Sequence, residues 1–221
     1  MSAAYSIEPT PGTEPTPAFS WPKLAKLLGT VSHAMSRDDS RYNLRGVYLE
    51  RDGAFLVATA TDGHRLAQAR AEIPLDLGDE GRIVSADDVA RILAESKRLT
   101  KANRGLADVG GIGGWDGTAL RLGIVSEEST LVLRPIEGTF PNYRQVIPAE
   151  DKLGAPVGFS GAYLAQAAAE LGKLAPKRLA TPIKIRLSAL PDGSPNALAP
   201  CRIDASGDGI EAFEIVMPQR P

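Results

Sequence analysis

Three segments of the chain place hydrophobic residues at helical spacing behind a serine. In the first, residues 18–31 (AFSWPKLAKLLGTV), Ser20 is a candidate N-cap and Pro22 suits the first helical turn. The hydrophobic stripe follows the i, i+3, i+4, i+7 pattern and consists of Leu24, Leu27, Leu28 and Val31. This pattern predicts an amphipathic helix that buries one face.

Two later segments repeat the arrangement. In residues 81–99, a short apolar strand ends at the cap Ser85, and the stripe consists of Val89, Ile92 and Leu93. In residues 155–174, a strand around Val157 and Phe159 ends at the cap Ser160, and the stripe consists of Leu164, Ala167, Ala168 and Leu171. The stripes begin at residues 24, 89 and 164, so they are separated by 65 and then by 75 residues.

Each helical segment is followed by two or three stretches typical of β-strands. These stretches are residues 42–51, 53–61, 106–115, 118–125, 129–136, 182–190, 201–206 and 211–218. Asp-Gly turn pairs such as Asp52-Gly53 and Asp116-Gly117 separate them. We therefore predict an α+β protein of three repeated modules, each a strand, a helix and then strands. A generic α+β domain with coincidental spacing is the alternative.

Composition narrows the class of protein without naming a function. The 221 residues are 43% hydrophobic, enough for a core, and a net charge of −2 argues neither for nor against a polyanionic partner. Residues 1–17 are rich in Pro, Thr, Ser and Glu and are predicted to be a disordered tail. The single Cys201 and the lack of a visible signal peptide or long apolar run predict a cytoplasmic protein with no membrane partner.

The polar stretch 59–69 (TATDGHRLAQA) is the main candidate for chemistry. If it is a strand, Asp62 and His64 share a face while Arg65 points away, as a catalytic dyad would require. The one other histidine is His33, and no serine lies in a G-x-S-x-G setting, so a structural turn or binding-site rim is favoured over an enzyme. An enzyme that uses Asp62 and His64 is the weaker alternative.

Other catalytic or ligand-binding motifs are not supported. The Gly-rich stretch 109–117 (VGGIGGWDG) lacks the Gly-Lys-Ser/Thr of a phosphate-binding loop and is predicted to be a strand with a loose hairpin. One cysteine and two separated histidines supply no recognisable cluster of metal ligands. We expect no metal and no cofactor.

The predicted helices also carry exposed basic residues. They are Lys23, Lys26, Arg91, Lys97, Arg98, Lys101 and Lys173. A solvated helix face usually has this composition, and Glu95 and Glu170 dilute its charge. The alternative is a surface that follows DNA phosphates, which would bind without sequence preference and with strong salt dependence.

Four separated motifs resemble one family. They are VSHAMSRDDSRYNLRGVYLE at 31–50, VATATDGHRLA at 57–67, GTFPNYRQVIP at 138–148 and FEIVMPQRP at 213–221. In this order they are similar to motifs of the bacterial DNA polymerase III beta subunit, the sliding clamp. The resemblance covers residues 18–221.

The resemblance implies a domain organisation. A domain of this family consists of two modules, with helices on one face, lining the hole of a ring, and antiparallel sheets on the other. A full-length clamp chain has three domains and therefore six modules, whereas three are counted here. Residues 18–148 resemble a complete middle-type domain, and residues 149–221 resemble the second half of the last domain.

The resemblance also implies a pocket between those two domains for short extended peptides of polymerases, the clamp loader and repair proteins. Its residues, carried over by position, are Leu44, Thr61, Gly63, His64, Arg65, Leu66, Pro141, Gln145, Val146, Ile215, Val216, Met217, Pro218 and Arg220, flanked by Ser160 and Tyr163. Adaptable apolar side chains with a few polar groups suit such a groove. Gln145 replaces a usual Arg and Gln219 a usual Met, so partner preference or affinity is expected to differ.

These expectations lead to two hypotheses about function. The first is a non-catalytic, sliding-clamp-like processivity or scaffold protein that encircles or clasps duplex DNA as a homo-oligomer. Because modules alternate in orientation around the family's ring, three modules per chain favour two-fold interfaces and a tetramer, with a dimer as the simpler case. The second hypothesis is a peptide-binding adaptor or decoy that never closes around DNA.

Overall fold

The computed structural model describes residues 19–102, 109–125, 127–149, 153, 156–172, 183–188, 190–194, 196, 199–207 and 210–218. The chain divides into two compact units, Met1–Arg144 (unit 1) and Gln145–Pro221 (unit 2), which are described separately. The tail predicted at residues 1–17 lies outside the described residues. The domain boundary expected after residue 148 stays a prediction.

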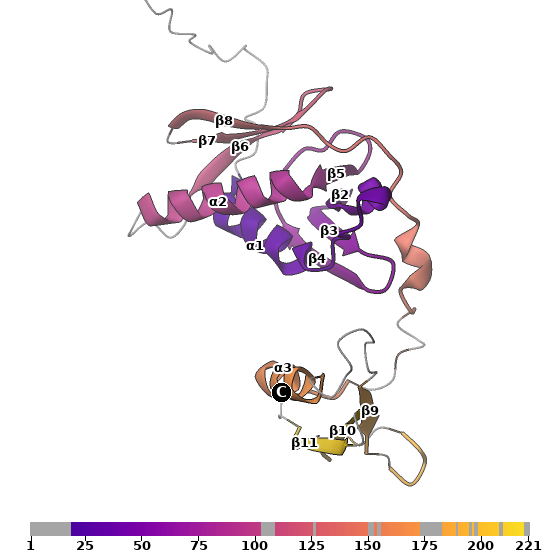
Figure 1. The fold of residues 1–221 in the computed structure, drawn as a ribbon. Coiled ribbons are helices and arrows are strands. Elements are labelled where there is room, and N and C mark those ends of the chain that lie inside the picture. Colours follow the sequence, from indigo (N-terminus) through magenta and orange to yellow (C-terminus); the bar gives the residue numbers. More distant parts are fainter. Residues whose placement is uncertain are drawn as a thin grey trace, which may run out of the picture. The chain divides into compact units, whose positions relative to one another are not determined.

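Unit 1 contains two copies of the same order of elements (Figure 1). The first copy consists of β1 (Phe19–Ser20), α1 (Trp21–Ser32), the 3-10 helix η1 (Asp39–Leu44), β2 (Gly46–Asp52), β3 (Phe55–Thr61) and β4 (Leu66–Glu72). The second copy consists of β5 (Arg82–Ser85), α2 (Ala86–Ala102), β6 (Gly110–Trp115), β7 (Leu120–Ile124) and β8 (Glu127–Leu133). A further 3-10 helix, η2 (Tyr143–Val146), begins at the end of unit 1.

The two copies in unit 1 exchange their first strands. One antiparallel sheet has the order β4-β3-β2-β5, and the other has the order β1-β6-β7-β8. The exchange is reciprocal in register: Ser85 lies opposite Gly46 at the start of β2, and Ser20 lies opposite Gly110 at the start of β6. Each copy therefore completes the sheet of the other.

The helices α1 and α2 lie side by side in unit 1 (Figure 1). A Cβ placed on Gly29 of α1 would lie 3.5 Å from Leu93 Cδ2 of α2, so the two helices approach closely there. The predicted stripe of α1 is buried, since Leu24, Leu28 and Val31 are each 0% exposed. Both helices and both sheets contribute to one continuous hydrophobic core.

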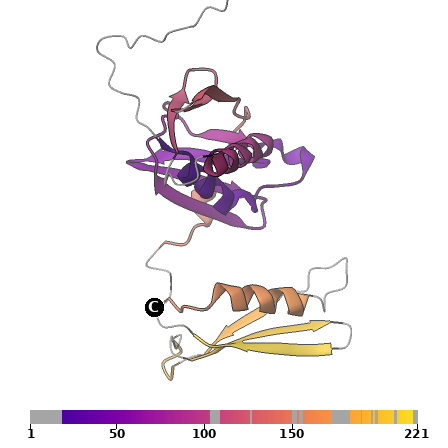
Figure 2. The same ribbon diagram turned by 90° about the vertical axis from the view of Figure 1, so that its left-hand side faces the viewer.

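The described residues of unit 2 form a single module. It consists of α3 (Gly161–Leu171), β9 (Lys184–Leu187), β10 (Cys201–Gly207) and β11 (Ile210–Val216), and the antiparallel sheet has the order β11-β10-β9. Figure 2 shows α3 lying along this sheet. Its small core is made of Ala167, Leu171, Cys201, Ile203, Ala205 and Val216.

The predicted helix caps are confirmed in all three modules. The hydroxyls of Ser20, Ser85 and Ser160 accept the backbone N–H of the third residue after them, at 3.2, 3.1 and 3.5 Å. Their spacing is the 65 and 75 residues expected from the hydrophobic stripes. The repeat predicted from the sequence is therefore present in the backbone.

Other details differ from the prediction. Ala168 was expected in the buried stripe of α3 but is exposed. The strand expected at Val157–Phe159 is reduced to one bridge between Phe159 and Pro218. Residues 42–44, expected to start a strand, belong to the 3-10 helix at 39–44. The strand β4 was not predicted, because the apolar positions of its sequence, LAQARAE, are mostly alanines, which are uncommon in strands.

Candidate functional site

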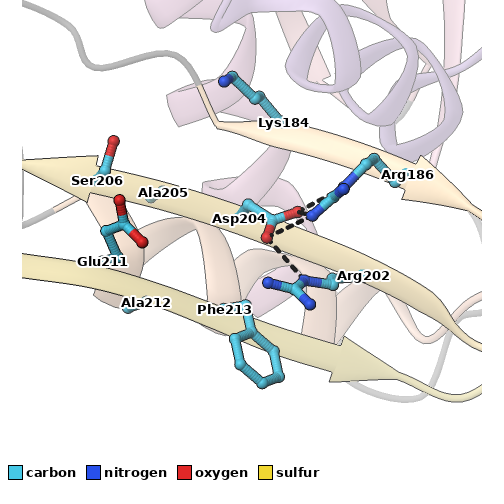
Figure 3. A pocket seen from close by; sticks show the side chains of 9 residues that line it. All are labelled: Lys184, Arg186, Arg202, Asp204, Ala205, Ser206, Glu211, Ala212 and Phe213. Atoms are coloured by element: carbon cyan, nitrogen blue, oxygen red, sulfur yellow. Dashed lines mark hydrogen bonds and ion pairs between the residues drawn. The ribbon is translucent and has the colours of Figure 1, made fainter.

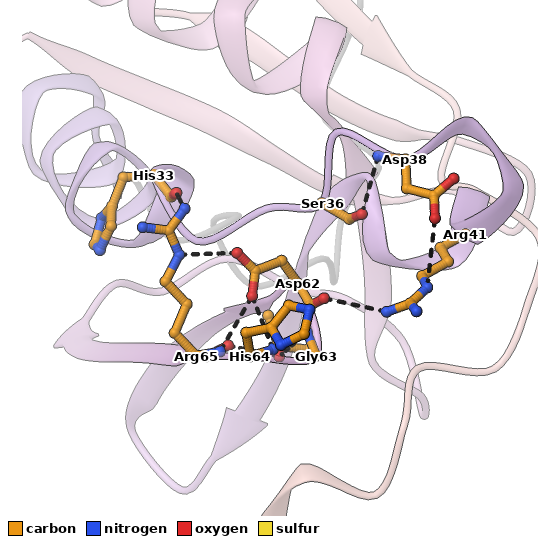
Figure 4. A network of polar contacts seen from close by, with 9 residues as sticks. His33, Ser36, Asp38, Arg41, Asp62, Gly63, His64 and Arg65 are labelled. Atoms are coloured by element: carbon orange, nitrogen blue, oxygen red, sulfur yellow. Dashed lines mark hydrogen bonds and ion pairs between the residues drawn. The ribbon is translucent and has the colours of Figure 1, made fainter. Parts of the chain in front are cut away.

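The turn between β3 and β4 is organised by Asp62 (Figure 4). Its Oδ1 accepts the backbone N–H groups of His64 at 3.0 Å and Arg65 at 3.1 Å, and its Oδ2 accepts Arg65 Nε at 2.9 Å. The hydrogen bond from the His64 backbone is the main reason why the pKa of Asp62 lies below its usual value. The carboxylate therefore stabilises a turn.

The expectation that Asp62 and His64 share a face while Arg65 points away is wrong. These residues lie in a turn and not in a strand, so strand alternation does not apply, and Arg65 pairs with Asp62. The imidazole of His64 is exposed and makes no hydrogen bond within the described part of the chain. The two side chains are not arranged as a catalytic dyad.

The same turn is tied to two neighbouring elements. Arg65 Nη2 donates to the His33 carbonyl at the end of α1 at 2.7 Å, and Arg41 Nη1 of η1 donates to the Asp62 carbonyl at 3.3 Å. Gly63 has φ +88°, and a Cβ there would lie 2.9 Å from Arg41 Nη1. Glycine at this position permits both the left-handed backbone and the close approach of Arg41.

Two of the predicted peptide-binding residues share an apolar cluster in unit 1. Leu44, 7% exposed, and the half-buried Leu66 pack with Ile83, Phe140 and Tyr143. Leu44 is therefore a buried residue of this cluster and not an exposed contact. Pro141 is exposed, and its carbonyl accepts the backbone N–H of Tyr143 at 2.7 Å.

A buried polar network next to this cluster was missed by the sequence analysis. The carboxylate of Glu50, 8% exposed, accepts the Tyr143 hydroxyl and, at 2.6 Å, Arg144 Nη2. Burial, together with the hydrogen bond to Glu50, raises the pKa of the Tyr143 hydroxyl. The sequence did contain a sign of this network: Glu50 lies within the largely apolar strand GVYLER, and a buried carboxylate requires a hydrogen-bond or ion-pair partner.

A depression of about 480 Å³ lies beside this network. It is lined by Tyr48, Glu50, Arg51, Gly78, Asp79, Glu80, Gly81, Gly138, Thr139 and Phe140. None of the predicted peptide-binding residues lines it.

The predicted peptide-binding residues of unit 2 have different environments. Ile215 and Met217 are exposed, whereas Val216, 3% exposed, lies in the core under α3. Val216 is therefore corrected to a core residue. Pro218 is held next to Phe159, directly before the helix cap, and Tyr163 is exposed in the first turn of α3.

The remaining predictions for the peptide site concern chain segments at the ends of unit 2. Gln145 and Val146 lie exposed in η2. Arg220 and Gln219 lie outside the described residues.

Ile215 pairs with Arg202 across β10 and β11, on the sheet face opposite α3. A polar depression of about 450 Å³ on this face is lined by Arg202 and its neighbours (Figure 3). On this face Asp204 accepts hydrogen bonds from Arg186 Nη2 at 2.8 Å and Arg202 Nε at 2.7 Å. The Arg202 guanidinium lies 4.0 Å from the centre of the Phe213 ring. The arginines are therefore engaged with Asp204 and Phe213.

The predicted DNA-binding residues fall into two groups. Arg91 pairs with Asp88 at 2.7 Å, and Arg98 binds Glu95 with two nitrogens, so their charge is partly neutralised. The hydrogen bond from Arg98 lowers the pKa of Glu95. In contrast, four exposed lysines make no ion pair within the part of unit 1 that the structure describes: Lys23, Lys26, Lys97 and Lys101. Lys173 lies outside the described residues.

Neither a metal site nor a membrane span is found among the described residues. They contain no group of three or more His, Cys, Asp or Glu residues that could hold a metal ion. None of their helices combines the length and the apolar character needed to cross a bilayer.

Comparison with known proteins identifies the fold and the family. Among solved structures, a DNA polymerase sliding clamp from Pseudomonas aeruginosa superposes with a TM-score of 0.70 at 25% identity, covering 91% of this chain and 50% of that chain. A Pseudomonas aeruginosa clamp described as bound to griselimycin gives a TM-score of 0.68 at 26% identity, covering 96% of this chain and 53% of that chain. The chain has the sliding-clamp fold.

Curated relatives agree. The beta sliding clamp of Rickettsia bellii is 31% identical over 130 residues, which cover 57% of this chain and 32% of that protein. The beta sliding clamp of Pseudomonas aeruginosa is 34% identical over 134 residues, covering 59% of this chain and 34% of that protein. The chain thus spans about a third of the length of these relatives. The family model for the DNA polymerase III beta subunit, central domain, matches residues 20–142, and the chain belongs to this family.

Proposed function

We propose that the chain is a non-catalytic, sliding-clamp-like processivity or scaffold protein that associates with duplex DNA as a cytoplasmic homo-oligomer. The match of residues 20–142 to the central domain of the beta subunit carries this proposal. The chain covers about half of a solved clamp chain, so DNA encircling, oligomerisation and peptide binding are all parts of the proposal.

DNA contact is assigned to the four lysines of α1 and α2 that lack an acidic partner within the described residues. An unpaired lysine on an exposed helix face can approach a phosphate without breaking an ion pair, whereas Arg91 and Arg98 would have to leave Asp88 and Glu95. Phosphate contacts of this kind carry no sequence information and release counterions, which permits sliding.

Replacing Lys23, Lys26, Lys97 and Lys101 together by Ala tests this assignment. We expect weaker duplex binding at low salt, and the slope of log K against log salt should flatten by about 0.9 for each phosphate that is no longer neutralised. Fluorescence anisotropy with a duplex at several salt concentrations measures both. Arg98→Ala is the matched control and should change the slope less. An unchanged slope in the four-lysine variant would reject the assignment.

Peptide binding is assigned to exposed residues of both units. In unit 1 these are Gly63, His64 and Arg65 of the turn, together with the half-buried Thr61. Leu44 and Leu66 of the apolar cluster and the exposed Pro141 are also assigned to the site. In unit 2 they are Gln145, Val146, Tyr163, Ile215 and Met217, together with the half-buried Pro218 and with Arg220, which lies outside the described residues. Val216 is left out because its side chain is buried. A rigid polar turn and exposed Met and Ile side chains are chemically suited to an extended apolar peptide.

The peptide assignment is tested with His64→Ala and Met217→Ala, measured separately by fluorescence titration with a short clamp-motif peptide. Truncating a side chain in an interface hot spot costs about 2 kcal/mol, or roughly thirtyfold in Kd. Phe213→Ala, which removes another exposed apolar side chain of β11, is the control and should leave Kd unchanged. Wild-type affinity in Met217→Ala would remove that residue from the site.

The adaptor or decoy without a ring is the second candidate, because unit 2 has one module where unit 1 has two. It predicts peptide binding without retention on linear DNA whose ends are blocked. A clamp that encircles DNA predicts retention there and release when the ends are freed. Electron microscopy of the free protein would show a central hole for the clamp and none for the adaptor.

A further inference from the structure

Among the described strands, none pairs with the outer edge of β9, whereas the equivalent strands in unit 1 have such a partner. In each module of unit 1, the first strand after the helix pairs on its outer side with the strand that precedes the other module's helix: β2 with β5, and β6 with β1. In unit 2, β9 pairs with β10 on one side, and no described strand pairs with the other. An unpaired edge presents backbone donors and acceptors to a further strand.

Apolar side chains on β9 are exposed where the equivalent side chains of unit 1 are buried. Ile185 and Leu187 lie opposite the buried Ile203 and Cys201, so all four point to the α3 side of the sheet. Ile185 is nevertheless 62% exposed and Leu187 43% exposed. By position from the start of each strand they correspond to Val47 and Leu49 of β2, which are 0% and 1% exposed. Val47 and Leu49 lie in the core that the two modules of unit 1 share.

The helix shows the same difference. Counted from the serine caps, Ala165 and Ala168 of α3 correspond to Ala25 and Leu28 of α1. Ala25 and Leu28 are 8% and 0% exposed in a unit where α2 lies beside α1, whereas both alanines of α3 are exposed. Small side chains at these positions permit a second helix to approach closely, as Gly29 permits for Leu93 in unit 1.

We propose that a second copy of unit 2 covers this surface, so that two chains together rebuild a complete two-module domain. The surface consists of the β9 edge, Ile185, Leu187, Ala165 and Ala168. In unit 1 the second module contributes a pre-helix strand and a helix, and in the pair of chains the second copy contributes its residues 157–159 and its α3. By the registers of unit 1, Ser160 of the second copy lies opposite Lys184 at the start of β9.

A second copy fits because each unit 2 carries both halves of the exchange. Its β9 edge requires a strand, and its segment around Phe159 is bridged on one side by Pro218, as Ile83 of β5 is by Ile136. In unit 1 the other side of β5 is taken by β2. A two-fold axis satisfies both requirements at once, and such isologous contacts form the commonest homo-oligomers. The inference rests only on the homo-oligomer part of the proposed function.

Ala168→Arg in the full chain tests this surface. Arginine has a helix propensity close to that of alanine, so α3 itself should stay folded. In the proposed pair, its charge would lie between the α3 helices of the two chains. Gln166→Arg is the control, because position 166 corresponds to Lys26, which stays exposed in unit 1 although α2 lies beside α1. Sedimentation should show self-association of the wild type and of Gln166→Arg, and a Kd about tenfold higher or more for Ala168→Arg, with unchanged circular dichroism.

Crosslinking provides a second readout that does not depend on the arginine. Ala168→Cys treated with a short bismaleimide should give a covalent dimer, whereas Gln166→Cys and the wild type, whose Cys201 is 1% exposed, should not. Oligomers of wild-type mass in Ala168→Arg, or no covalent dimer of Ala168→Cys, would overturn the inference while leaving association through another surface possible. A wild-type monomer at all concentrations would overturn the homo-oligomer as well, and the DNA and peptide titrations would still be informative.

Discussion

At the scale of single residues, aspartates organise the turns of this protein. Asp62, Asp116 and Asp192 each accept backbone N–H groups two residues ahead, and each is followed by a glycine with positive φ. An aspartate side chain that satisfies backbone donors in this way holds a tight turn in one conformation. This role explains why an Asp close to a His need not indicate catalysis.

Gly63→Ala separates the backbone demand of the β3–β4 turn from its contact with Arg41. A non-glycine residue in the left-handed region costs about 1–2 kcal/mol, and the new methyl group would also displace Arg41. Gly53→Ala is the control, because Gly53 has φ +57° but nothing within 4 Å of the added Cβ. Urea denaturation should show a larger loss of unfolding free energy for Gly63→Ala, and equal losses would mean that Arg41 does not constrain the turn.

At the scale of elements, the repeat is most evident where each helix begins. Ser20, Ser85 and Ser160 cap the three helices. The two that lie in unit 1, Ser20 and Ser85, also end the strands that are exchanged between its modules. One residue thus serves as the last residue of a strand and as the cap of the following helix. The position of the helix relative to the sheets is set at this point.

Ser85→Ala should therefore destabilise unit 1 by about 1 kcal/mol, since the backbone N–H of Asp88 loses its acceptor. Ser160→Ala should cost unit 2 less, because its hydrogen bond to Tyr163 is longer, at 3.5 Å. Denaturation followed by circular dichroism measures both losses. A larger effect for Ser160→Ala would show that this serine contributes more than its cap, for example through the pairing proposed for unit 2.

At the scale of the whole molecule, the two units differ in the size of their cores. The core of unit 1 spans two sheets and two helices, whereas the described part of unit 2 has a core of six buried residues. Small cores give marginal stability. We therefore expect unit 2 to unfold first, with a midpoint that rises with protein concentration if two copies associate through it.

Leu171→Ala tests the independence of the units. Removing this buried side chain should lower the unfolding free energy of unit 2 by about 2–5 kcal/mol. The unfolding transition of unit 2, followed by circular dichroism, should then occur at a lower denaturant concentration. Both tryptophans, Trp21 and Trp115, lie in unit 1, so the fluorescence transition should stay in place. Leu99→Ala removes a buried side chain of unit 1, so it should shift the fluorescence transition and leave the transition of unit 2 in place. A fluorescence shift in Leu171→Ala would show that the units unfold together.

The amino-acid sequence by itself determined the three modules. Helix position followed from the serine caps and hydrophobic stripes, because those signals are local and recur in the same order in each module. Most strands were predicted from local alternation and turn pairs, and β4 was missed because its apolar positions are mostly alanines, which have a low strand propensity. The peptide-site residues came from a resemblance of motifs, and their role stays a prediction.

Only the tertiary structure decided how the modules share strands and which side chains are covered. The exchange of β1 and β5 joins residues far apart in the chain, and no local pattern specifies it. The stripe of α3 predicted Ala168 as buried, but burial depends on the neighbouring element, and unit 2 has one module. The roles of Val216 in the core and of Arg65 as the partner of Asp62 likewise depend on contacts in three dimensions, because periodicity predicts a face and not its occupant.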